Sequence, residues 1–106
     1  MNKKIQVLYV EPMQEPHLKE IELTLDNLQM LVGGYFEAVY PFDDPVVLVC
    51  NEEGKYNGQL PNRAMIINGQ LHDIIYGPFF IAGIGEEDFE SIPDNLIRKY
   101  TEFFSD

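Results

Sequence analysis

The sequence is short of the residues that proteins use for covalent and metal chemistry. It has one cysteine, Cys50, so no internal disulfide can form, and its two histidines add few further ligands for a metal site. Ser91 and Ser105 are its two serines, and neither lies in a glycine-flanked nucleophile turn. We therefore predict no catalytic residue, no metal and no cofactor.

Cations are also scarce. Seven lysines and arginines stand against 18 aspartates and glutamates, which gives a net charge of −11. Because such a chain repels phosphates and anionic lipid, we expect neither direct nucleic-acid binding nor membrane binding. Two explanations of the acidity stay open: it keeps a small protein soluble, or it imitates nucleic acid and occupies a basic groove of a partner.

Long apolar runs are absent as well. No stretch approaches the roughly 20 apolar residues that span a bilayer, and no basic start followed by an apolar run indicates a secretory signal. With 106 residues, of which 45% are hydrophobic, residues 1–106 are expected to form a single globular domain. We expect this domain in the cytoplasm.

Hydrophobic periodicity predicts the elements that are present. The strand patterns are Lys4–Val10, Tyr35–Tyr40, Val46–Cys50 and Phe79–Ala82. Val46–Cys50 is apolar on both faces, which places it inside a sheet. Thr24–Val32 is predicted as a helix that Gly33 and Gly34 end, whereas residues 20–23 fit either a strand or a helix.

Asn68-Gly69 predicts a hairpin with arms Ala64–Ile67 and Gln70–Ile75, and Ser91 is predicted to cap a final helix. Strands and helices do not alternate regularly, so we predict an α+β fold. In it, a mixed, mainly antiparallel sheet of five to six strands carries two helices packed on one face. Such a sheet leaves its second face uncovered, which favours a homo-oligomer.

The densest group of polar side chains follows the buried strand Val46–Cys50. We predict a ligand-binding site there, formed by Asn51, Glu53, Lys55, Tyr56, Asn62 and Arg63. These side chains supply amide, ammonium and guanidinium donors and a ring for stacking, and an arginine forks readily onto a carboxylate or phosphate. The predicted ligand is therefore a small anion, such as a nucleotide.

Two other interpretations stay open. In the first, Arg63 pairs with Glu52 or Glu53 and the asparagines satisfy turn backbone, so that the same residues are purely structural. In the second, the protein is a small hydrolase that uses His72 and Asp73, the one adjacent imidazole–carboxylate pair. Neighbouring side chains of a strand point to opposite faces, which argues against that pair.

Several blocks together resemble an uncharacterised family, domain of unknown function 3846. These blocks are Ile5–Pro12, Leu28–Glu37, Cys50–Lys55, Pro61–Ala64 and Ile74–Ile81. The resemblance covers nearly the whole chain, and it implies a protein of phages, plasmids or conjugative elements, hence the host cytoplasm if a phage encodes it. It transfers no activity and no catalytic residue.

Three functions follow as expectations. The first is a non-enzymatic counter-defence protein that sequesters a host ligand near Asn51–Arg63, either a small nucleotide signal or the surface of a host defence protein. The second is an acidic nucleic-acid mimic that inhibits a host DNA-binding or restriction complex. The third is the hydrolase that uses His72 and Asp73.

Overall fold

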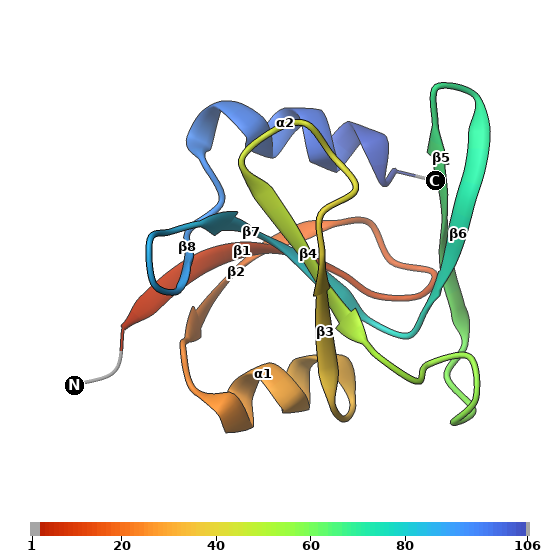
Figure 1. Cartoon of the computed structure of the whole chain (residues 1–106), viewed down its shortest axis with the longest axis horizontal. Coiled ribbons are helices and arrows are strands. Elements are labelled where there is room, and N and C mark those ends of the chain that lie inside the picture. Colours follow the sequence, from red (N-terminus) through yellow and green to blue (C-terminus); the bar gives the residue numbers. More distant parts are fainter. Residues whose placement is uncertain (1–2, 106) are drawn as a thin grey trace.

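The fold is built around one antiparallel sheet, with a helix on each face and a hairpin to one side (Figure 1). The computed structural model describes residues 3–105. The elements are β1 (Lys4–Val10), β2 (His17–Glu22), α1 (Leu25–Val32), β3 (Phe36–Val39), β4 (Val46–Asn51), β5 (Pro61–Ile67), β6 (Gln70–Tyr76), β7 (Phe79–Ile84), β8 (Phe89–Glu90) and α2 (Asp94–Phe103). The strand order is β2-β1-β7-β4-β3, and β8 pairs with β7.

β4 is buried along its whole length, as its apolar sequence predicts. Its residues alternate between two hydrophobic cores: Val46, Leu48 and Cys50 pack on one side of the sheet, while Val47 and Val49 pack on the other. β7, which pairs with β4, is divided between the two cores in the same way. The centre of the sheet therefore needs cover on both faces.

The two helices supply that cover from opposite sides. Leu28 and Val32 of α1 belong to the core that contains Val47 and Val49, whereas Leu96 and Tyr100 of α2 belong to the other core. Figure 1 shows the sheet as the middle layer between the helices. The α+β class is confirmed, but packing of both helices on one face is wrong, because apolar side chains on both faces of the central strands must be buried. Every strand pair in the described part is antiparallel, not mixed.

Local signals set the ends of α1 as predicted. The Thr24 hydroxyl accepts a hydrogen bond from the Asn27 N–H at 3.1 Å, and Gly33 closes the helix in the left-handed conformation with φ 78°. Of the ambiguous residues 20–23, residues 20–22 form the end of strand β2. The predicted cap of α2 is wrong: the Ser91 hydroxyl instead accepts from the Gln6 N–H at 2.9 Å, and Pro93 stands at the N-cap without a side-chain bond.

β5 and β6 form the predicted hairpin as a separate two-stranded sheet. Asn68 and Gly69 both have positive φ, as the tight turn between the strands requires. Met65 and Ile75 of the hairpin join the core beneath α2, so this face of the main sheet is covered by α2 and the hairpin together. The uncovered face that favoured a homo-oligomer is therefore not present among residues 3–105, and the oligomer stays a prediction.

Within the described residues, neither helix is long and apolar enough to cross a bilayer.

The turn between β3 and β4 is fastened to α2 by one carboxylate. Asp44 accepts hydrogen bonds from the Lys99 ammonium and from the Tyr100 hydroxyl, each at 2.5 Å. The bond from Lys99, followed by that from Tyr100, lowers the pKa of Asp44 below its usual 3.8. Burial and the adjacent Asp44 raise the pKa of Tyr100, which keeps its hydroxyl a donor at neutral pH.

We predict that this carboxylate makes part of the stability depend on acid pH. Because its folded pKa is lowered, its contribution is present above the unfolded value and is lost as the pH falls through the folded pKa. Thermal melts between about pH 3 and pH 7 should show a smaller acid-induced fall in Tm for Asp44→Asn than for the unmodified protein. Asp43→Asn is the control, since Asp43 is exposed and makes no side-chain bond among residues 3–105. Superimposable pH profiles for the unmodified protein and Asp44→Asn would contradict this role.

Candidate functional site

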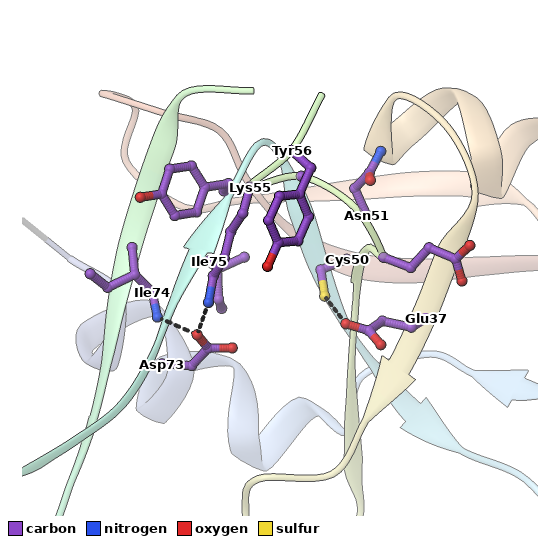
Figure 2. Close-up of a pocket in the computed structure, with 11 residues that line it drawn as sticks. Glu37, Cys50, Asn51, Lys55, Tyr56, Asp73, Ile74 and Ile75 are labelled. Carbon is purple, nitrogen blue, oxygen red and sulfur yellow. Dashed lines mark hydrogen bonds and ion pairs between the residues drawn. The ribbon is translucent and has the colours of Figure 1, made fainter. Parts of the chain in front are cut away.

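A cavity of about 210 Å³ opens where β4 leaves the sheet, between β3 and β6 (Figure 2). Its polar lining comes from four segments: Glu37 of β3, Asn51 of β4, Lys55 and Tyr56 of the following loop, and Asp73 of β6. The loop packs tightly on β6, since a Cβ added at Gly54 would lie 2.7 Å from the Tyr76 carbonyl oxygen. A glycine is therefore required for the close approach that forms this wall.

Asn51 holds the start of the loop. Its buried side-chain amide donates to the Val32 carbonyl at 3.1 Å, and its oxygen accepts from the Glu53 N–H at 2.8 Å and from the Asn57 amide at 3.4 Å. Two of these bonds pair the side chain with backbone groups, one at the end of α1 and one in the loop. This agrees with the interpretation in which the asparagines have a purely structural role. Glu53 enters this network through its N–H, and it is not among the residues that line the cavity.

An ion pair crosses the cavity from the loop to the hairpin. The Lys55 ammonium lies 2.7 Å from Asp73 Oδ1, which also accepts from the Ile74 N–H at 2.8 Å (Figure 2). The bond from Lys55 lowers the pKa of Asp73, and the same bond raises the pKa of Lys55. Both groups are therefore charged at neutral pH.

The cavity is acidic despite this lysine. Glu37, Glu52 and Asp73 all line it, and Lys55 is the one cation in its lining. Tyr56 leaves 88% of its surface exposed, so its ring is free to stack on a bound group. The arrangement therefore favours a positively charged group over an anion.

The Cys50 thiol forms part of the cavity wall without nucleophilic character. Its Sγ atom lies 3.9 Å from Glu37 Oε1. Burial, reinforced by the charge of Glu37, raises the pKa of Cys50 to about 12, so the thiol stays protonated at neutral pH. No group of three or more ligating side chains within residues 3–105 could hold a metal ion.

Arg63 lies apart from the cavity and binds backbone carbonyls. Its Nε donates to the Phe104 carbonyl at 2.7 Å, Nη2 to the Gln14 carbonyl at 2.5 Å, and Nη1 to the backbone and side-chain oxygens of Asn62. Asn62 in turn donates to the carbonyls of Val10 and Gly77, each at 2.9 Å. These two residues tie the hairpin to β1, to the connection after it and to the end of α2.

The structure thus brings together three of the six residues predicted for the site. Asn51, Lys55 and Tyr56 line the cavity, while Glu53, Asn62 and Arg63 do not. Glu37 and Asp73 line it and were not predicted, because they come from strands that lie far apart in the sequence. The sequence feature that could have identified Glu37 and Asp73 is that each is a charged residue inside a strand.

His72 and Asp73, the proposed hydrolase pair, make no hydrogen bond to each other among residues 3–105. Asp73 is engaged by Lys55, and His72 is exposed. In this geometry the Asp73 carboxylate is hydrogen-bonded to Lys55 and not to His72, and the hydrolase stays a prediction.

A comparison with protein-family models matches residues 5–105 to one model, described as "Domain of unknown function (DUF3846)". This is the family that the sequence blocks resemble, and the match spans nearly the whole chain. The comparison with curated proteins and the comparison with solved structures each give no significant match.

We predict that Arg63 is required for folding stability. Arg63→Ala should lower the free energy of unfolding by about 2–4 kcal/mol, because it removes a buried donor from the Phe104 carbonyl and a partly buried donor from the Gln14 carbonyl. Urea unfolding at pH 7 measures this loss. The matched control is Arg98→Ala, which removes an exposed arginine paired only with Glu102 and should change stability by less than about 0.5 kcal/mol. Equal stability of the two variants would contradict the structural role of Arg63.

Proposed function

Because the chain belongs to the family of domain of unknown function 3846, whose description states no activity, we propose a function from the cavity itself. The protein is a non-catalytic binding protein, and the acidic cavity between β3 and β6 takes a basic side chain from the surface of a partner protein. The observation that carries the proposal is the ion pair between Lys55 and Asp73: the cavity already holds an ammonium group there.

The size of the cavity supports a side chain as the ligand. Its volume of about 210 Å³ lies below the roughly 300–1,000 Å³ of pockets that enclose drug-sized molecules. Its carboxylates would also repel a phosphate, and Arg63, the predicted phosphate fork, is occupied elsewhere. Of the two ligands expected from the sequence, a protein surface is therefore better supported than a nucleotide signal.

The state of the potentially reactive groups supports binding over turnover. The Cys50 thiol is protonated at neutral pH, and Asp73 is an ionised carboxylate already engaged by Lys55. A general acid or base needs a pKa near the working pH, and a nucleophile needs an activating base. Neither condition is met by these two groups.

The partner we propose is a host defence protein with a basic surface, sequestered in the host cytoplasm by a phage or mobile-element protein. Two facts support this setting: the family resemblance, which implies mobile elements, and the net charge of −11, which accelerates encounters with basic partners. The alternative, an acidic mimic of nucleic acid, relies on the same charge but needs no cavity.

We predict that removal of Lys55 strengthens cation binding. In Lys55→Ala, Asp73 is released from its internal partner, so a short lysine peptide such as acetyl-Gly-Lys-Gly-amide should bind up to about fivefold tighter. Glu37→Gln should weaken the same binding. The measurement is the dissociation constant from an NMR shift titration at low salt, with adenosine monophosphate as the anionic comparison.

The sign of the Lys55 effect separates the hypotheses. A nucleotide site would instead bind adenosine monophosphate and lose that binding in Lys55→Ala. The charge-matched control is Glu86→Gln, which like Glu37→Gln removes one negative charge, but at an exposed residue outside this cavity. If that control weakened peptide binding as much as Glu37→Gln does, the cavity proposal would be overturned in favour of diffuse charge mimicry.

A further inference from the structure

A second cavity, of about 170 Å³, adjoins the acidic cavity and differs from it in chemistry. The two adjoin along four shared lining residues, Glu37, Cys50, Asp73 and Ile75, and we call the two cavities together the groove. Beyond the shared part, the second cavity is lined mainly by apolar side chains, namely Val39, Pro41, Leu48 and Met65, together with His72. The groove thus has an acidic end and an apolar end.

The register of β3 sets the spacing between the two ends. Glu37 lies opposite Cys50, and Val39 lies opposite Leu48, so Glu37 and Val39 point to the same face of the sheet. Two residues of a strand span about 6.6–6.8 Å. A group beside Glu37 and a group beside Val39 are therefore separated by about one two-residue step of extended chain.

Strands border the groove on both sides, and each has one unpaired edge. Within residues 3–105, β3 pairs only with β4, and β6 pairs only with β5. On β6, the Ile74 N–H donates to the Asp73 carboxylate. A segment of extended chain, whose alternate side chains project from one face, matches the spacing of the two ends of the groove.

We propose that the groove binds an extended peptide segment of the partner in which a basic and an apolar side chain are two residues apart. The inference rests on the proposed function and names the class of ligand. The basic side chain enters the acidic cavity and replaces Lys55 at Asp73, and the apolar side chain enters the cavity beside Val39 and Met65. In an extended chain these two side chains project from one face, whereas in a helix positions i and i+2 do not.

Charge complementarity selects this occupant over a wholly apolar one. Three carboxylates against one lysine line the acidic end, so an apolar group there would leave them desolvated without a counterion. A free amine, in turn, would leave the apolar end empty. A segment with both groups matches both ends of the groove.

The test compares peptides of one composition and different order. Acetylated and amidated peptides containing Lys-Thr-Leu or Leu-Thr-Lys place the two side chains on one face, while Thr-Lys-Leu places them on opposite faces. We expect one of the first two to bind at least about fivefold tighter than the third, because its leucine is also buried. Isothermal titration calorimetry at low salt gives the three dissociation constants.

Two variants test whether the preference for one peptide order arises at the apolar end of the groove. Val39→Thr keeps the shape of the side chain but places a hydroxyl in the apolar end of the groove. It should lower the affinity of the more tightly bound peptide to that of Thr-Lys-Leu. Ile84→Thr, at an exposed residue of β7 outside the groove, should keep the preference. Equal affinity of all three peptides, with the strengthening in Lys55→Ala retained, would overturn this inference and leave the proposed function standing. No binding of any peptide would overturn both.

Discussion

The position of the hairpin depends on the hydrogen bonds of Asn62 and Arg63, and the groove depends on the hairpin. Within residues 3–105, β5 and β6 share no ladder with the main sheet, so backbone pairing between strands does not fix their position. Arg63 instead binds the carbonyls of Gln14 and Phe104, and Asn62 binds those of Val10 and Gly77. A guanidinium presents its donors in a rigid planar fork, and such a group can hold two elements at a fixed separation. The width of the groove between β3 and β6 follows from that separation.

The two cations of this region have different roles, and burial decides which role each one has. Arg63 is buried, and among its hydrogen bonds are those to the carbonyls of Gln14, Asn62 and Phe104, whose dipoles help to solvate its charge inside the protein. Lys55 is exposed and meets one carboxylate as a point charge on a flexible stem. A buried, multiply bonded arginine is costly to displace, whereas an exposed lysine pair contributes little and exchanges readily.

Local patterns predicted the elements well, because caps, turns and strand periodicity act within a few residues. The cap at Thr24, the Asn68-Gly69 turn and the burial of β4 are of this kind. The placement of the helices was wrong because it depends on both faces of the sheet at once. Asn51, Lys55 and Tyr56, which were predicted together because they are close in sequence, line the same cavity. Glu37 and Asp73 reach the cavity through strand register, and the pairing of β5 with β6 shifts register between Met65 and Ile66, which the sequence does not reveal.

An acidic protein attracts every cation, so charge alone does not select one basic partner over others. On the proposed function, Lys55 addresses that problem by occupying Asp73 in the free protein. An incoming cation gains only the difference between its own contact and that of Lys55, which is small for a lone ammonium group. Affinity must then come from the apolar end of the groove, where burial of an apolar side chain is favourable. The internal ion pair therefore converts general attraction for positive charge into selection for segments that also carry the adjacent apolar residue.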